Sequence, residues 1–403
     1  MVAAVRNPSN FARRRPGIET VAVDFNRDVS PDVWRPRLAG IDAVVNCAGV
    51  LHGGRGQDLE AIHAAAPIAL FEACRQAGVT RIVQISAIGT ETDTAYSRTK
   101  KQADDHLLGL PLEGTVLRPS LIYGEGSYGG TSTLRGLAGL PWITPLIGDD
   151  CAAFRPLHVD DLVETVARVL ESPRLARQTL EPVGPEKLTT GEIVALYRRW
   201  LGLGPAVTIS IPVPLMRQVA ILADLAGGGP MGTAGLRQLL AGNAGREPDG
   251  VFAAAIGFTP ATLATRLARR PAQTQDLWHA RLYFLRPMLR LALAAMWIGS
   301  AVAGFLAEPS QYAGVDRIIS ALGLAPWPIG LLFSAIDLAL GAALLLRLKP
   351  RWLAAAQLVI VGGYTIGLGL VAPKLWLDPF GSLLKNLPIL AAIFLWSVLE
   401  TER

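Results

Sequence analysis

Four long apolar stretches near the C-terminus constrain the fold more than any other feature of this sequence. They lie at about residues 289–307, 329–346, 352–372 and 383–399. Burying this much apolar helix needs either lipid or a very large core, because about 20 consecutive apolar residues match the hydrocarbon thickness of a bilayer. We therefore predict that residues 282–403 form an all-α bundle of four transmembrane helices, with membrane lipid around it.

Two positions in these stretches raise alternatives. Asp337 lies in the middle of the second stretch, where an ionised carboxylate is costly unless it is paired or faces a polar cavity. It is either a functional residue or an acid that hydrogen-bonds between helices and only fixes their packing. The fourth stretch spans the bilayer if residues 383–386 extend it and Lys385 reaches the interface; the alternative is a buried hairpin.

The charges that flank the apolar stretches predict an orientation. Three arginines lie before or at the start of the first stretch, and three cations fill the turn between the second and third: Arg281, Arg286, Arg290, Arg347, Lys349 and Arg351. Cytoplasmic loops carry an excess of Lys and Arg, so both segments are predicted to be cytoplasmic. The segment after the first stretch carries fewer cations and is predicted to lie on the opposite side. We expect a multi-pass protein of the cell inner membrane with a cytoplasmic N-terminal domain.

The composition argues against two other classes of protein. The formal net charge is +5, but the basic residues are scattered rather than gathered in one patch with aromatic side chains. Nucleic acid is therefore not a predicted partner. Cys47, Cys74 and Cys151 form no CxxC pair and have no His cluster beside them. We predict neither a metal site nor a disulfide framework.

Short apolar runs alternate with helical patterns before the membrane part. The runs lie at residues 2–5, 18–23, 43–45 and 81–85. This alternation predicts an α/β domain of Rossmann-like type over residues 1–270, with a doubly wound parallel sheet, followed by a linker at 271–281. Ligands bind such sheets in the crevice beyond the carboxyl ends of the strands.

Tyr96, Lys100 and Ser86 are the predicted catalytic residues. Tyr96 and Lys100 lie four residues apart on a predicted helix and so share one face. The Lys100 ammonium is expected to lower the pKa of the Tyr96 phenol, which is otherwise a poor acid or base at neutral pH. Ser86 follows a strand and can donate a hydrogen bond to a substrate carbonyl. The alternative is a chance spacing, which amphipathic helices often contain.

Five motifs occur in the order found in a known family. They are NCAG at 46–49, ISAIG at 85–89, YSRTK at 96–100, LRPSLIYGEG at 117–126 and FRPLHVDDL at 154–162. Over residues 2–269 the chain resembles the extended short-chain dehydrogenase/reductases, and within them the atypical branch similar to the complex I accessory subunit that binds NADPH. The resemblance implies a small substrate lobe and an NAD(P)H cofactor. Members of this branch can keep the Tyr–Lys pair and yet act as structural or regulatory cofactor binders.

The predicted cofactor contacts lie at the ends of the strands. Arg6 stands where this fold contacts the adenosine ribose, and an arginine suits the 2′-phosphate of NADP, with NAD as the alternative. Asp24 resembles the family's acid that contacts adenine, or it caps a turn. Small residues in NCAG allow backbone to approach the cofactor closely, and the residues after Arg118 would present backbone to the nicotinamide. The predicted set is Arg6, Asp24, Asn46, Cys47, Ala48, Gly49, Tyr96, Lys100, Pro119, Ser120 and Leu121.

The glycine-rich turn of a dinucleotide-binding fold is not found where it is expected. Such a fold opens with a strand and a glycine turn whose amides bind the pyrophosphate. The run at residues 2–5 matches the second strand of the family pattern instead. We expect a preceding strand, glycine turn and helix, on the order of 25 to 30 residues, upstream of Met1, with a truncated chain as the alternative.

The membrane part and the N-terminal domain together predict a function. Over residues 282–399 the chain resembles the DoxX-like family, small bundles related to a quinone-linked subunit. We predict a membrane-anchored NAD(P)H-dependent oxidoreductase that reduces a carbonyl or quinone-like, lipophilic substrate. One alternative is a non-catalytic NADPH-binding assembly or sensor protein with a membrane-protein partner. The other is a nucleotide-sugar epimerase or dehydratase.

Overall fold

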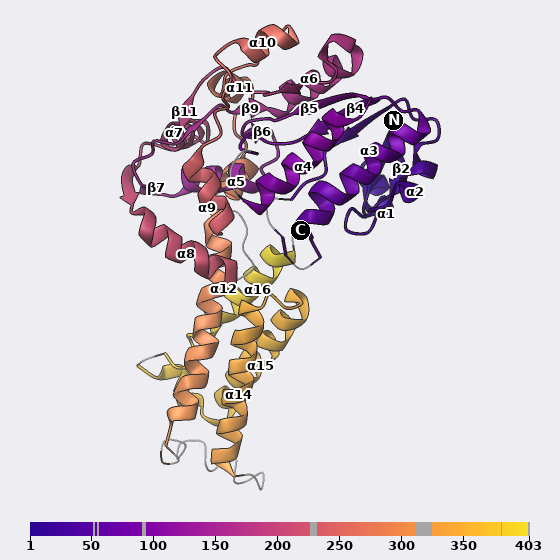
Figure 1. Ribbon diagram of the computed structural model, residues 1–403. Coiled ribbons are helices and arrows are strands. Elements are labelled where there is room, and N and C mark those ends of the chain that lie inside the picture. The colour runs from indigo at the N-terminus through magenta and orange to yellow at the C-terminus, as the bar shows by residue number, and fades with distance from the viewer. Residues whose placement is uncertain are drawn as a thin grey trace. The chain divides into compact units, whose positions relative to one another are not determined.

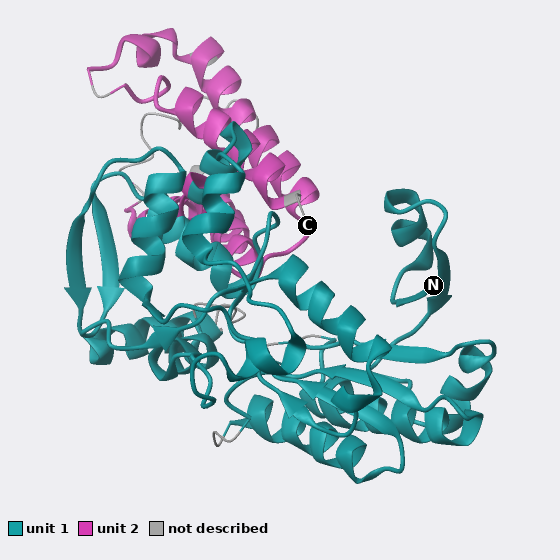
Figure 2. Ribbon diagram, turned by 90° about the horizontal axis from the view of Figure 1, so that it is seen from above, with its two compact units in different colours: residues 1–280 teal, residues 281–403 magenta. Residues whose placement is uncertain are grey.

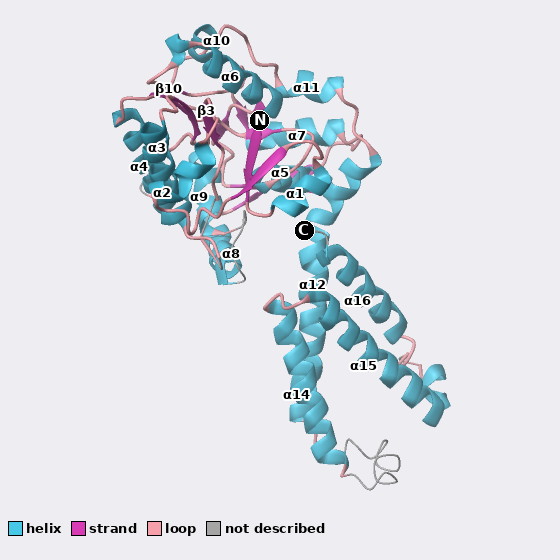
Figure 3. Ribbon diagram, turned by 90° about the vertical axis from the view of Figure 1, so that its right-hand side faces the viewer, coloured by secondary structure: helices cyan, strands magenta, loops and turns pink. Residues whose placement is uncertain are grey.

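The chain divides into an N-terminal unit, Met1–Ala280, and a C-terminal unit, Arg281–Arg403 (Figure 2). The computed structural model describes residues 1–50, 53–54, 56–90, 94–225, 232–308, 310, 325–379 and 381–401. Within these residues the first unit mixes strands and helices, whereas the second is helical (Figure 3). Each unit has its own hydrophobic core, and the two are described separately below.

A parallel sheet forms the centre of the N-terminal unit. Its order is β10 (Thr179–Leu180), β5 (Glu113–Leu117), β4 (Arg81–Ile85), β3 (Ala43–Asn46). All neighbours are parallel, and the register places Asn46 beside Gln84 and Ile85 beside Leu117. The carboxyl ends of β3, β4 and β5 therefore lie at the same edge of the sheet. The predicted parallel Rossmann-like sheet is confirmed.

Helices cover both faces of this sheet, as the alternation of side chains along a strand requires. Ile82 joins the core under α3 (Ala66–Ala77) and α4 (Ala95–Gly109), and the next residue, Val83, joins the core under α6 (Val159–Glu171). Both side chains are fully buried. Figure 1 shows α3 and α4 side by side on one face of the sheet. Consecutive residues of β4 thus fix both layers of the domain.

The first two strands form a separate parallel sheet. β1 (Val2–Val5) pairs with β2 (Glu19–Ala22), and α1 (Pro8–Arg14) connects them. Within the described residues neither strand pairs with β3. Val21 and Val23 still pack into the core beneath α3. These parallel strands therefore form two sheets: β1 and β2 make one, and β3, β4, β5 and β10 make the other.

A smaller lobe packs beside the main sheet. Its helices surround a core that contains Ile193, Tyr197 and Leu263. The elements of the rest of the unit are α2 (Pro31–Trp34), η1 (Arg35–Leu38), η2 (Ala61–Ala65), β6 (Ile122–Tyr123), α5 (Gly129–Gly139), β7 (Ile143–Ile147), β8 (Ala153–Phe154), β9 (Leu157–His158), η3 (Pro173–Leu175), β11 (Leu188–Thr189), α7 (Thr190–Trp200), β12 (Val207–Ile211), α8 (Val213–Leu225), α9 (Thr233–Ala241), α10 (Val251–Ile256) and α11 (Leu263–Arg269). Short pairs of strands join segments of the lobe; β7, for example, pairs with β12 in parallel.

The predicted linker at 271–281 is helical from Thr274 onward. It forms the first turns of α12 (Thr274–Leu306), a helix of 33 residues. Gln273 N donates to the Asp276 carboxylate at 3.0 Å, which starts the helix. Ala280 is buried against Gly139, where an added Cβ would lie 2.7 Å from the Ala280 carbonyl carbon. This segment is part of a helix because it packs closely against α5. The local sequence does not reveal that contact.

The C-terminal unit continues α12 and adds α14 (Pro326–Leu345), α15 (Pro350–Val371), η5 (Pro373–Leu377) and α16 (Asn386–Thr401). Among the described helices, α12, α14 and α15 are long and apolar enough to cross a membrane. α16 has 16 residues, fewer than the roughly 20 that a span needs. The fourth helix does not extend back to residue 383 as predicted, because residues 383–385 form a turn. Leu383 is buried in this turn, and Asn386 Nδ2, where the helix begins, donates to Thr365 Oγ1 at 2.9 Å.

Polar side chains join the helices of this unit, one pair buried and one partly buried. Ser300 Oγ on α12 donates to Asp337 Oδ2 on α14 at 2.6 Å. Trp297 Nε1 donates to Gln357 Oε1 at 2.7 Å and so connects α12 to α15. The Asp337 contact is the one expected of an acid that hydrogen-bonds between helices, which is the packing alternative of the sequence analysis.

Candidate functional site

One face of α4 carries the predicted pair together with an unexpected acid. Tyr96, Lys100 and Asp104 follow at intervals of four residues and therefore lie on the same side of the helix. The helix begins at Thr94, whose Oγ1 accepts a hydrogen bond from Ser97 N at 3.1 Å. Ala103 and Leu107, on another side, are fully buried in the core and fix the rotation of the helix. This packing directs the polar face toward the ends of β3 and β4.

Lys100 lies at the carboxyl edge of the sheet. Its ammonium donates to Ile85 O at 3.1 Å and to Ala48 O at 3.3 Å, the residues that end β4 and follow β3. The side chain is only 4% exposed, and burial lowers the pKa of Lys100 while the Asp104 carboxylate opposes that shift. An added Cβ on Gly49 would lie 3.1 Å from Lys100 Nζ. The glycine therefore leaves room for this ammonium.

Asp104 is the partner of Ser86. Ser86 Oγ donates to Asp104 Oδ2 at 2.7 Å, and Arg118 Nε donates to the same oxygen at 3.1 Å. Asp104 is fully buried; burial raises the pKa of its carboxyl, and the bonds from Ser86 and Arg118 oppose that shift. The predicted substrate donor Ser86 is thus bonded to a protein acid. Sequence reasoning missed Asp104 and Arg118, although the i, i+4 spacing from Lys100 was a usable signal for Asp104.

The expected effect of Lys100 on Tyr96 is not found. The pKa of Tyr96 is raised to about 12, first by burial and then by the negative charge of Asp104. The prediction of a lowered pKa is wrong because the Lys100 ammonium turns to two backbone carbonyls, while Asp104 shares the face of the phenol. At neutral pH Tyr96 is therefore protonated, which suits a proton donor rather than a base.

His63 is a buried neighbour that the sequence analysis did not identify. It lies in the π-helical turn η2, where Val50 N donates to its Nε2 at 2.9 Å. Its Nδ1 is 3.1 Å from Thr99 Oγ1, and its ring meets the Tyr96 ring edge-on with centroids 5.2 Å apart. Because Nε2 accepts, the proton of the neutral ring is on Nδ1. Burial and Lys100 lower the pKa of His63 to about 4, so it stays neutral.

Asn46 orders the turn that follows β3. Its side chain donates to Gln84 Oε1 at 2.7 Å and accepts from Ala48 N at 3.0 Å. Asn46 is buried, whereas Cys47 is exposed. The asparagine thus couples β3 to β4 and directs the Ala48 carbonyl toward Lys100. The small residues of this turn lie beside the ammonium, and their contact with a cofactor stays a prediction.

Arg6 and Asp24 lie on the other sheet, at the ends of β1 and β2. Arg6 is exposed. Asp24 Oδ1 accepts from Asn26 N at 3.1 Å, and Asp24 N donates to Asp28 Oδ2 at 2.7 Å. These contacts are those of the turn-capping alternative for Asp24. A cofactor role for either residue stays a prediction.

The segment after β5 lies beside a cavity. Ser120 Oγ donates to Asn243 O and accepts from Arg155 N, while Pro119 O and Leu121 O accept bonds from Ile88 N and Leu157 N. Ser120 thus connects this segment to Asn243, and its neighbours connect it to Ile88 and Leu157. The neighbouring cavity has a volume of about 330 Å³ and is lined by Ile88, Gly89, Thr90, Arg118, Ala153, Glu181 and residues 241–246. Arg118 links this cavity to Asp104.

The site fits the nicotinamide-ribose end of a dinucleotide. The Lys100 ammonium has three donors, and the described residues accept two bonds from it, so one donor is left for a ribose hydroxyl. Ala48 and Gly49 expose backbone next to it. Lys100 and this turn are therefore the residues that would hold the cofactor at this edge. Among the described residues no group of three His, Cys, Asp or Glu could hold a metal ion.

Comparisons with known proteins agree with this description. Residues 1–137 match a family model described as NAD(P)H-binding, and residues 294–394 match one described as the DoxX-like family. No curated protein matches the chain.

Solved structures show the fold of the N-terminal part. One is a dTDP-glucose 4,6-dehydratase, DesIV, from Streptomyces venezuelae, solved with NAD bound; it has 17% identity and a TM-score of 0.51 over 70% of this chain and 87% of that chain. Another is gox2253, with 18% identity and a TM-score of 0.51 over 70% and 90%. A dTDP-glucose 4,6-dehydratase from Bacillus anthracis in complex with NAD has 15% identity and a TM-score of 0.50 over 69% and 86%. The chain thus combines an N-terminal part that has a Rossmann-like fold and matches an NAD(P)H-binding family model with a C-terminal part that matches the DoxX-like family model.

Proposed function

We propose that this protein is a membrane-anchored NAD(P)H-dependent oxidoreductase that reduces a carbonyl or quinone-like, lipophilic substrate. The observation that carries the proposal is the buried Lys100 ammonium, held at the carboxyl edge of the sheet one helical turn from Tyr96. This edge is where the fold binds dinucleotides. The DoxX-like domain and three apolar helices support a location at a membrane, where lipophilic substrates are concentrated.

The residues of the site have distinct parts in this proposal. NAD(P)H held by Lys100 and the turn after β3 would supply a hydride to the carbonyl carbon. Tyr96 gives its proton to the carbonyl oxygen, and water restores the phenol afterwards. A raised pKa suits this direction, because the phenol stays protonated until the substrate oxygen gains negative charge. Ser86 turns its hydroxyl from Asp104 to the substrate carbonyl and so orients it. The negative charge of Asp104 stays paired, because Arg118 Nη2 lies 3.0 Å from Asp104 Oδ2.

NADP is the proposed cofactor, and Arg6 carries that preference. An arginine at the end of this strand can pair with a 2′-phosphate that NAD lacks. We expect Arg6→Gln to weaken NADPH binding by roughly tenfold and to leave NADH binding unchanged, since a charged hydrogen bond of this kind is lost. Fluorescence titration of the full chain with both dinucleotides measures the two affinities. Equal losses for NADPH and NADH would contradict this role.

The experiment that tests the activity uses the full chain in lipid nanodiscs. NADPH oxidation is followed with carbonyl and quinone acceptors of increasing lipophilicity. We expect Tyr96→Phe to lower kcat by about 10²-fold or more while NADPH still binds, because a positioned proton donor is lost. Lys100→Met should weaken NADPH binding. Lys101→Met is the matched control, since Lys101 is the next residue of α4 and pairs with Asp105 on the exposed side. Unchanged turnover of Tyr96→Phe would overturn the mechanism.

A non-catalytic NADPH-binding protein is the second candidate. The observation that favours it is the engagement of Ser86 by Asp104 at 2.7 Å, which leaves the hydroxyl turned to the protein. In this case the full chain retains NADPH, turns over none of the acceptors, and co-purifies with a membrane-protein complex. Substitution of Tyr96 then changes neither the retention of NADPH nor the co-purification with the complex. The same nanodisc assay separates the two candidates.

A further inference from the structure

One end of the C-terminal unit gathers charged side chains from α12, from α16 and from the turn between α14 and α15. The chain enters the bundle here along α12, returns to it at the turn between α14 and α15, and returns again at the end of α16. Leu293, Leu344, Leu353 and Trp396 lie in one buried cluster, so these segments pack together. This end is distinct from the Asp337 contact and from the dinucleotide site.

A single carboxylate at this end pairs with two arginines. Arg286 Nη2 lies 3.3 Å from Glu400 Oε2, and Arg290 Nη1 lies 3.5 Å from Glu400 Oε1. The side chains of Arg290 and Glu400 are 8% and 11% exposed. Arg347 lies in the turn after α14, three residues after Leu344 of this buried cluster, and adds a third positive charge at this end. Three guanidinium groups against one carboxylate leave a surplus of positive charge; Arg290 and Glu400 are largely closed to water, whereas Arg286 is 37% exposed and Arg347 is exposed.

Two buried donors in this region have no acceptor among the described residues. They are Arg290 Nε and Trp396 Nε1. Trp396 is 1% exposed and precedes Glu400 by four residues, so the two side chains share one face of α16. A buried N–H without an acceptor is costly, and so is a buried charge without a partner. Both the charge surplus and the free donors are relieved by the same kind of ligand, an anion with several acceptor oxygens.

We propose that Arg286, Arg290 and Arg347 bind a phosphate group at this end of the bundle. Guanidinium groups bind phosphate through paired, charge-assisted hydrogen bonds, and Arg290 Nε is a donor left for such a pair. The phosphate belongs either to the headgroup of an anionic phospholipid or to free inorganic phosphate. Basic pockets between membrane helices bind anionic headgroups in this way.

The test uses the delipidated full chain in detergent. Thermal unfolding and retention of lipid in native mass spectrometry are measured with phosphatidylglycerol, with phosphatidylcholine and with inorganic phosphate. We expect phosphatidylglycerol to raise the unfolding temperature and to be retained, and phosphatidylcholine to do neither. An equal rise with inorganic phosphate alone identifies the free anion as the source. No response to either anion overturns the proposal.

Variants separate binding from a purely structural ion pair. Arg290→Gln should weaken phosphatidylglycerol binding about fivefold or more, as expected for the loss of one cationic contact. Glu400→Gln should strengthen it, because the internal competitor for the arginines is removed. Arg351→Gln is the control, since Arg351 is exposed and lies near the same turn. If the cluster only closes the bundle, Glu400→Gln destabilises the protein without any gain in anion binding, and the proposal fails.

Discussion

His63 shows how one buried side chain makes the site sensitive to pH. Its neutral ring accepts from Val50 N and reaches Thr99 on α4, so it joins the turn after β3 to the helix that carries Tyr96. Protonation would remove the acceptor for Val50 and place a second cation near Lys100. Because burial is the main reason for the lowered pKa, the folded state resists a proton that the unfolded chain accepts.

The sign of this pH dependence follows from the direction of the shift. The pKa of His63 falls from 6.5 to about 4 on folding, so its contribution to stability is complete above pH 6.5 and is lost as the pH falls toward 4. The expected loss is about 3 kcal/mol. Unfolding midpoints of the full chain between pH 7 and pH 4 measure it. His63→Gln keeps an acceptor for Val50 and should remove this part of the dependence; an identical pH profile in the variant would contradict the assignment.

Gly49 should be required for the position of the Lys100 ammonium. An added methyl group would lie 3.1 Å from Lys100 Nζ and 3.7 Å from His63 Nε2, so Gly49→Ala displaces the end of the lysine side chain. We expect NADPH affinity to fall by roughly tenfold, as for the loss of one charged contact, with little change in stability. Gly54→Ala is the control, because an added Cβ there meets nothing within 4 Å. Equal NADPH affinities in the two variants would show that Gly49 has no such role.

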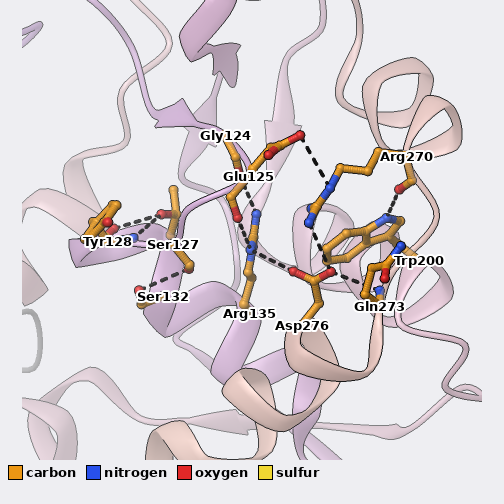
Figure 4. A network of polar contacts seen from close by, with 11 residues as sticks. Gly124, Glu125, Ser127, Tyr128, Ser132, Arg135, Trp200, Arg270, Gln273 and Asp276 are labelled. Carbon is orange, nitrogen blue, oxygen red and sulfur yellow. Dashed lines mark hydrogen bonds and ion pairs between the residues drawn. The ribbon is translucent and has the colours of Figure 1, made fainter. Parts of the chain in front are cut away.

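At the scale of elements, a polar network connects four parts of the N-terminal unit (Figure 4). Arg135 on α5 donates to Gly124 O at 2.6 Å and pairs with Asp276 of α12 at 3.9 Å. Arg270 pairs with the same carboxylate at 3.5 Å, and Trp200 of α7 donates to Arg270 O at 2.6 Å. The Arg135 guanidinium also stacks over the Trp200 ring, 5.2 Å from its centroid. Asp276 thus connects α5 to the start of α12, and Arg135 and Arg270 connect this pair to Trp200 of α7.

Loss of this acid should destabilise the lobe. Asp276 is 6% exposed and Arg135 is 3% exposed, so Asp276→Ala leaves a buried guanidinium without its counter-charge. The free energy of unfolding should fall by about 3 to 5 kcal/mol. Glu164→Ala removes an exposed pair with Arg168 and should change it by less than about 1 kcal/mol. Denaturation of the full chain followed by tryptophan fluorescence compares the two variants; similar midpoints would argue against a structural role for the network.

At the scale of the whole molecule, the distribution of cations predicts which loops share a side of the membrane. We expect residue 349, in the turn between α14 and α15, to lie on the same side as the N-terminal unit and residue 308 to lie on the opposite side. Lys349→Cys and Glu308→Cys can be introduced after Cys47, Cys74 and Cys151 are replaced. An impermeant thiol reagent added to intact cells and to inverted vesicles should label them from opposite sides. Labelling of both from one side would disprove this topology.

Periodicity and local motifs predicted the elements well but not all of their limits. Short apolar runs predicted the parallel strands, and long apolar runs predicted the apolar helices, because there are few ways to bury such runs. The fourth apolar helix is shorter than expected because Leu383 is buried in a turn rather than in the helix. The segment at 271–281 is helical because Ala280 packs on Gly139, a contact between residues far apart in the sequence.

The sequence alone determined the fold class, the two-part organisation and the face of α4 that carries Tyr96 and Lys100, because these depend on periodicity within one segment. Only the tertiary structure decided what those side chains contact. It paired Ser86 with Asp104 and Asp104 with Arg118, set His63 against Tyr96, and turned Lys100 to the carbonyl that ends β4 and to one in the turn after β3. Burial by segments distant in the chain, together with the charge of Asp104 on the same helix, determines the pKa of Tyr96. The chemistry of the pair therefore depends on packing that no single segment specifies.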